Sequence, residues 1–236
     1  MLKKSSFAAI AFAIITLISF NSCRKELPVT VSPEEIADIV SNALQYETSG
    51  AVMEALSAVT LGDIYTALDE HCNETFDSTL NYSYSQNTVS ADYERSMEWV
   101  VNCTGFNIPT DIAYTSTANG EYSTFRMSSV DASSNELTIT GLDIGGGNYF
   151  VNGTSVRTGT QESNIRDMSL SSTCDLTLED VEISKSTYEI IAGEGTVTVT
   201  GENSGGNSFS FTGSIVFNGD GTATLTLNGT EYTINL

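Results

Sequence analysis

Apolar and polar residues alternate one by one along most of the chain after residue 73, and this period of two restricts the fold more than any other feature. The segments 91–101, 209–217, 223–227 and 232–236 each carry apolar residues at nearly every second position. Residues two apart in a strand face the same side of a sheet, so each segment has one face to bury and one to hydrate. The pattern predicts antiparallel β structure for residues 73–236.

Asn-Gly dipeptides punctuate this region at 119–120, 152–153, 218–219 and 228–229. Asn-Gly suits the type I′ turn of two-residue hairpins, so we expect a hairpin turn at each of the four dipeptides, within about twelve short strands in all. An open twisted sheet of that size tends to curl or to split into two packed sheets. The sequence therefore predicts a long antiparallel meander, arranged as a curved sheet or a sandwich.

Between residues 32 and 72 the apolar residues recur at helical spacing instead of at every second position. Ser32, Pro33 and Glu35 form a start signal, with a capping side chain, a proline suited to the first turn and the acid of a capping box. Gly50 and the pair at 62–63 interrupt the apolar stripe that follows. We expect a helical hairpin and a third short turn that cover part of the sheet. The fold class is mainly β with N-terminal helices (α+β), and the helices and residues 73–236 form one domain.

The first 22 residues have the features of a secretion signal. Lys3 and Lys4 supply a short positive region, and residues 7–20 are apolar except for Thr16 and Ser19. This stretch is shorter than the roughly 20 residues of a membrane-spanning helix. Its flanks are those of a signal peptide, so we predict that residues 1–22 are removed on export.

Phe20-Asn21-Ser22-Cys23 resembles a bacterial lipobox in the relaxed form found in Bacteroidota lipoproteins. In that motif the Cys23 thiol is diacylated and becomes the mature N-terminus, and several acyl chains hold a protein firmly to a membrane. Residues 23–31 are then the lipidated cysteine and a tether, whose residues 24–31 reach at most roughly 28 Å. Arg24 stands where an aspartate would resemble an inner-membrane retention signal, which favours the outer membrane of a Gram-negative bacterium. The periplasmic and the cell-surface face both stay open.

Two further segments extend the resemblance. Residues 148–159 read NYFVNGTSVRTG and residues 209–236 read FSFTGSIVFNGDGTATLTLNGTEYTINL. Together with the lipobox they are similar to a group of uncharacterised secreted lipoproteins of Bacteroidota. The resemblance implies an anchored chain with a short helical segment and a β-rich body. The group has no established activity, so the resemblance implies no catalytic residue and no cofactor.

The charge of the chain excludes one class of partner. Acidic residues number 30 and Lys plus Arg number 9, which gives a formal charge of −21. Nucleic-acid binding depends on cations that neutralise phosphates, so we expect no nucleic-acid partner. The expected partner is the membrane, through Cys23.

Three cysteines remain once Cys23 is assigned to lipid. An oxidising compartment favours a disulfide, and we favour Cys72 with Cys103, which would join the end of the helical segment to the end of a strand. Cys174 lies among strand-forming residues, and we expect it to be a small buried hydrophobic side chain.

Catalytic motifs are scarce. His71 is the only histidine, and neither a C-x-x-C pair nor a G-x-S-x-G elbow is present, so we expect no metal site and no serine triad. A pair of carboxylates is the remaining route to an enzyme, since a glycosidase needs only two acids. The candidates for such a pair are Glu94 with Glu98, or the acids of 179–182. A solvated strand face explains these acids more simply.

Tyr82, Tyr93 and Trp99 fall on the apolar side of neighbouring predicted strands. On an exposed concave face they would stack on a glycan or line an apolar groove; in the alternative they belong to the sheet's own core. Asp77-Ser78-Thr79 resembles the short O-glycosylation site of exported Bacteroidota proteins, which makes Ser78 a candidate acceptor.

These observations favour a non-enzymatic, lipid-anchored envelope protein with a binding or structural role. Two alternatives stay open. The first is a binder or carrier of an apolar or glycan ligand in the concavity of the sheet. The second is a glycan-active enzyme that uses a pair of carboxylates.

Overall fold

A computed structural model describes residues 30–66, 71–143 and 145–236. The predicted signal peptide, Cys23 and most of the tether therefore lie outside the described residues. Two helices precede ten strands, with these bounds: α1 Pro33–Leu44, α2 Ala51–Thr66, β1 Thr75–Gln86, β2 Val89–Cys103, β3 Pro109–Ser123, β4 Met127–Thr140, β5 Asn148–Ser163, β6 Met168–Ser184, β7 Ile190–Asn203, β8 Ser208–Phe217, β9 Thr222–Leu227 and β10 Thr230–Asn235.

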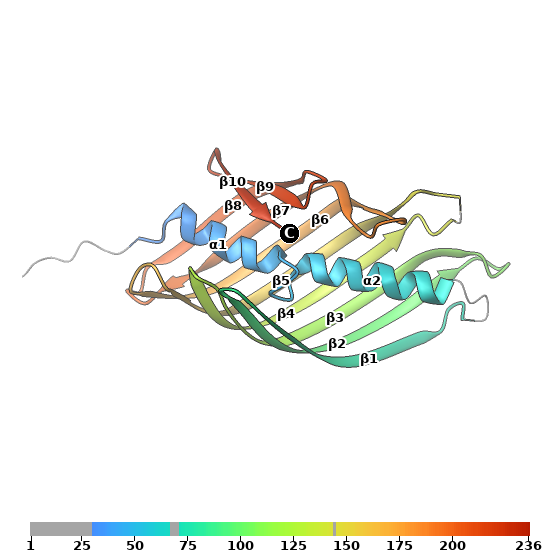
Figure 1. The fold of residues 1–236 in the computed structure, drawn as a ribbon, viewed down its shortest axis with the longest axis horizontal. Helices are drawn as coiled ribbons and strands as arrows, with labels where there is room; N and C mark the ends of the chain where they lie inside the picture. The colour runs from blue at the N-terminus through green and yellow to red at the C-terminus, as the bar shows by residue number, and fades with distance from the viewer. Residues whose placement is uncertain (1–29, 67–70, 144) are drawn as a thin grey trace, which may run out of the picture.

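The ten strands form a single open sheet in which each strand pairs antiparallel with the next one along the chain. The predicted meander is confirmed, and its form is one curved sheet rather than a sandwich. Figure 1 shows the sheet twisted and bent, with both helices lying on one of its faces. That face is called the inner face below, and the opposite one the outer face.

Two of the four predicted Asn-Gly turns are wrong, because β3 runs through residues 119–120 and β5 through residues 152–153. A β-carbon at Gly120 would lie 2.0 Å from the main-chain oxygen of Asp92 and 2.6 Å from the ring of Tyr93, so this glycine gives room to both the backbone and an aromatic side chain of the neighbouring strand. Gly153 has a φ of +145° at a β-bulge against β6. The other two dipeptides do connect β8 to β9 and β9 to β10.

The predicted start of α1 is confirmed in detail. The Ser32 hydroxyl accepts a hydrogen bond from the Glu35 main-chain nitrogen at 3.4 Å, and the Glu35 carboxylate accepts one from the Ser32 nitrogen at 3.0 Å. These two bonds form the capping box and satisfy two donors that a helix N-terminus leaves open. The capping box therefore fixes the residue at which α1 begins.

The two helices do not lie side by side as the predicted hairpin. They follow one another across the inner face, α1 over β6, β7, β9 and β10, and α2 over β2 to β5. Helix α2 also continues through residues 62–63, where the sequence predicts an interruption. A β-carbon at Gly62 would lie 2.0 Å from Cδ1 of Ile112, so this glycine permits close packing of the helix on β3.

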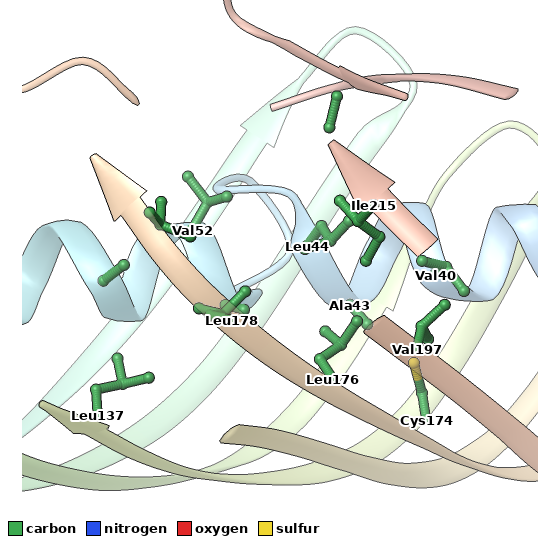
Figure 2. Packing of buried hydrophobic residues seen from close by; sticks show 14 of the residues in the cluster. Val40, Ala43, Leu44, Val52, Leu137, Cys174, Leu176, Leu178, Val197 and Ile215 are labelled. Carbon is green, nitrogen blue, oxygen red and sulfur yellow. The ribbon is translucent and has the colours of Figure 1, made fainter. Parts of the chain in front are cut away.

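One continuous core joins the helices to the sheet. Figure 2 shows Val40 and Leu44 of α1 packed against side chains that include Leu176 of β6 and Ile215 of β8. Burying a side chain of this size stabilises a fold by about 1.5–3 kcal/mol. The helices and the sheet therefore share one core of buried residues.

Candidate functional site

An ion pair lies buried between α2 and the inner face of the sheet. Arg95 of β2 donates from Nε and Nη2 to Oε1 of Glu54, at 2.9 and 2.8 Å. The other carboxylate oxygen of Glu54 accepts hydrogen bonds from the hydroxyls of Tyr114 at 2.7 Å and Ser116 at 2.8 Å. Four donors therefore engage the Glu54 carboxylate, which fixes α2 on β2 and β3.

A second buried arginine fixes the junction of the two helices. Arg157 of β5 donates to Oδ1 of Asp131 at 2.9 Å, and to the main-chain carbonyls of Asn42 at 2.7 Å and Thr48 at 2.8 Å. It also donates to the hydroxyl of Tyr93. Burial alone would lower the pKa of Arg157, but the Asp131 carboxylate raises it, and the resulting pKa lies above the usual value.

Both groups of side chains are enclosed, and most of their polar atoms are hydrogen-bonded to one another; Oδ2 of Asp131 is buried without a hydrogen-bond partner among the described residues. The Arg95 and Glu54 side chains are 2 % and 1 % exposed, and Arg157 and Asp131 are buried as well. A buried charge pair of this kind needs its hydrogen bonds to offset the loss of hydration. The arrangement is that of a structural attachment between helices and sheet, not of a site open to substrate.

The three aromatic residues predicted to bind a ligand lie in different surroundings. Tyr93 and Trp99 are buried in the core beneath the helices, and Trp99 stacks on Phe76 with ring centroids 5.8 Å apart. Tyr82 lies half-buried near the sheet edge, where its hydroxyl donates to the carbonyls of Tyr46 and Glu47. Burial raises the pKa of Tyr82 to about 12, so this hydroxyl stays a donor throughout the physiological range.

An apolar groove lies close to Tyr82, between α2 and the edge strand β1. Its volume is about 260 Å³. Leu80 of β1 is 45 % exposed within it. The remaining lining residues are Tyr46, Leu56, Ser57, Thr60, Leu61 and Met97. The alternation in β1 directs Leu80 and Tyr82 to the inner face, beyond the edge of α2, and leaves this strip of the face partly uncovered.

A larger depression, of about 600 Å³, lies over β1 to β5. Its lining includes Asp92, Glu121 and Glu162, together with several serines. Asp92 and Glu121 are direct cross-strand neighbours, and such neighbours have β-carbons about 4.5–5.5 Å apart. The predicted pair Glu94 and Glu98 lies exposed on the outer side of β2, four residues apart along the strand.

The predicted disulfide Cys72–Cys103 is confirmed, with a Cα–Cα distance of 5.5 Å. Cys174 is a free, buried cysteine, as predicted, and burial raises its pKa to about 12. His71 lies 3.0 Å from the carboxylate of Glu74. Ser78 lies half-buried on β1.

The described ranges contain no group of three or more His, Cys, Asp or Glu side chains placed to hold a metal ion. Neither helix within them has the length and apolar content required to cross a membrane. Comparison of the chain with known protein families, curated proteins and solved structures found no match in any of the three. Arguments about function therefore rest on the residues themselves.

Proposed function

We propose that the chain is a lipid-anchored protein of the bacterial cell envelope, held to the outer membrane by acyl chains on Cys23, and that it acts by binding rather than by catalysis. The observation that carries the binding role is the open apolar groove between α2 and β1. The lipobox and the preceding apolar segment support the anchor.

The groove suits a ligand of limited size. Aliphatic side chains of Leu56, Leu61 and Leu80 form much of its lining, and its volume of about 260 Å³ lies just below the roughly 300–1,000 Å³ of typical small-molecule sites. It can take an aromatic ring system or a short acyl segment. The bulk of a lipid would remain outside.

The charge of the chain narrows the ligand class further. With 30 acidic residues against 9 Lys and Arg, the protein repels anions over its surface. The ligand we propose is therefore a neutral or cationic molecule, or part of one, with an apolar portion that enters the groove.

The test of binding uses the exported, processed protein and the neutral apolar fluorophore N-phenyl-1-naphthylamine. Leu80→Lys places a charge in the groove and should weaken probe binding at least tenfold. Val216→Lys is the matched control, because Val216 on β8 is also 45 % exposed and lies away from the groove. Equal binding by both variants, or no binding by the wild-type protein, would overturn the groove as the site.

The anchor has its own test. Intact mass measurement of the protein purified from membranes should give a chain that begins at Cys23 and carries acyl groups. The Cys23→Ala variant should retain residues 1–22 and lack the added mass. An unmodified Cys23 in the wild-type protein would refute the anchor and leave the groove hypothesis standing.

A second candidate function rests on the larger depression. Asp92 and Glu121 face each other across β2 and β3, and Glu162 lies in the same depression. A glycan-active enzyme needs two such carboxyl groups about 5–9.5 Å apart. Hydrolysis of a panel of aryl glycosides that is lost in both Asp92→Asn and Glu121→Gln would favour this function. Hydrolysis that persists in both variants, or none by the wild-type protein, would exclude this pair.

A further inference from the structure

Two loops at one end of the sheet present apolar side chains to solvent. Phe125, in the β3–β4 loop, is 69 % exposed, and Ile165, in the β5–β6 loop, is 51 % exposed. Asn164 joins the loops, because its main-chain nitrogen donates to the Arg126 carbonyl at 2.8 Å and its side chain donates to the Thr124 carbonyl at 3.0 Å. The two apolar side chains therefore lie on a connected surface, which we call the tether-end surface.

This surface adjoins the point at which the chain leads back to Cys23. Arg166 donates to the carbonyl of Thr30 at 3.2 Å and to Glu35 at 3.0 Å. Arg126 donates to Asp38 of α1 at 2.9 Å. Thr30 lies seven positions after Cys23, and seven residues span at most about 25 Å. An anchor at Cys23 therefore keeps these loops close to the lipid.

The cations of the chain also favour this end. Among the described residues, Arg95 and Arg157 are buried and three Lys or Arg side chains reach the surface. Two of those three are Arg126 and Arg166, each directly after an exposed apolar residue. An apolar side chain beside a partly exposed arginine suits the boundary between headgroups and acyl chains. Asp38, Glu35 and the neighbouring Asp167 limit the local positive charge, so a neutral lipid surface is the better fit.

We propose that the tether-end surface docks on the membrane, with Phe125 and Ile165 entering the interfacial region of the lipid. This inference rests on the proposed anchor at Cys23. Hairpin loops of a meander alternate between its two ends, so the β2–β3 loop with Phe106 lies at the opposite end. Docking holds the long sheet in one orientation on the bilayer and points the Phe106 end away from it.

The experiment compares tryptophan at the two ends of the molecule. Phe125→Trp and Phe106→Trp are made in the full chain, exported and processed, and reconstituted in phosphatidylethanolamine–phosphatidylcholine vesicles whose acyl chains are brominated near the headgroup. Phe106 is 90 % exposed, so neither change disturbs the core. Trp99 is the only native tryptophan, and the wild-type signal is subtracted.

Docking predicts a blue-shifted emission for Phe125→Trp and quenching at least twice that of Phe106→Trp. Equal quenching at the two ends, or stronger quenching at Phe106→Trp, overturns the proposal. Flotation of the vesicles distinguishes the hypothesis of an anchor at Cys23 from the hypothesis of docking by the tether-end surface. If the lipidated protein floats but shows no quenching at position 125, the anchor hypothesis stands and the docking hypothesis is refuted. If the protein carries no acyl group and does not float, both hypotheses are refuted.

Discussion

Nη2 of Arg95 and Oε1 of Glu54 lie 2.8 Å apart beneath α2, in a pair of side chains that are almost fully enclosed. Arg95 comes from the sheet and Glu54 from the helix, so the pair joins the two layers. Removing one partner of a buried ion pair leaves the other charge desolvated without compensation, which costs about 3–5 kcal/mol. The pair therefore controls how strongly α2 stays attached to the sheet.

The first prediction follows from this pair. Glu54→Gln should lower the free energy of unfolding by about 3–5 kcal/mol, because it leaves the Arg95 charge unpaired. Urea unfolding followed by circular dichroism measures the effect. Glu98→Gln, on the exposed face of β2, the strand that carries Arg95, is the control and should change stability by less than about 0.5 kcal/mol.

A double variant distinguishes a buried charge from lost packing. Glu54→Leu combined with Arg95→Met replaces the pair by apolar side chains and should be more stable than either single variant, since no charge stays uncompensated. If the two single losses simply add in the double variant, Arg95 and Glu54 do not act as a pair.

The second prediction concerns Arg157, whose guanidinium donates to Asp131 and to two main-chain carbonyls at the helix junction. Lysine keeps the charge but cannot reach these acceptors together, because it lacks the planar fork of arginine. Arg157→Lys should lower the free energy of unfolding by about 1–3 kcal/mol, the penalty for a buried group left unpaired. Thermal unfolding of variant and wild-type protein measures the loss.

Arg126→Lys is the matched control for this substitution. Arg126 pairs with Asp38 at the surface, where both side chains are partly exposed, and such pairs contribute about 0–1 kcal/mol. A loss at Arg126→Lys as large as that at Arg157→Lys would show that the buried acceptors are not the cause.

The sequence predicts much of the sheet and little of the contacts that hold the helices on it. Alternation of period two is local, so the strands and the meander follow directly from it. The turn predicted at Gly120 was wrong because this glycine packs closely against Tyr93 of the neighbouring strand. A dipeptide pattern holds no information about a ring 27 positions away.

The attachments between helix and sheet are missed for a similar reason. Glu54 lies 41 positions before Arg95, and Asn42 lies 115 positions before Arg157. The sequence does contain a signal, since Arg95 occupies a position on the apolar side of β2 and Glu54 interrupts an apolar stretch of α2. A charge on each of two apolar faces suggests a buried pair, but the pairing itself needs the tertiary structure.

The third prediction concerns the number of thiols that react with a thiol reagent in the folded, unfolded and reduced protein. Cys174 is enclosed and its pKa is raised to about 12, so no thiol of the native, processed protein should react with Ellman's reagent at neutral pH. Unfolding without reductant should expose Cys174 alone, and reduction should add Cys72 and Cys103. An acylated Cys23 does not react. The Cys174→Ala variant should give no signal before reduction, and a thiol that persists in that variant would mean an unmodified Cys23.

The fourth prediction concerns stability at alkaline pH. Burial raises the pKa of Tyr82 to about 12 and also raises the pKa of four core tyrosines, Tyr93, Tyr114, Tyr122 and Tyr149. The unfolded chain has tyrosines with a pKa near 10. The folded state therefore binds these protons more tightly, so the stabilisation is complete below about pH 10 and declines as the pH rises towards 12.

Tyr93 and Tyr114 strengthen this effect, since their hydroxyls donate to the carboxylates of Asp131 and Glu54. Ionisation would replace each hydrogen bond by repulsion between two anions. Near-ultraviolet absorbance should show the core tyrosines ionising only well above pH 10, in one cooperative step together with loss of the β-sheet circular dichroism signal. The chain unfolded in guanidinium should instead ionise all ten tyrosines around a single midpoint. The folded protein could instead ionise all its tyrosines around one midpoint while its β-sheet circular dichroism signal persists. In that case hydroxide reaches the tyrosines between the helices and the sheet, and the packing described for them is wrong.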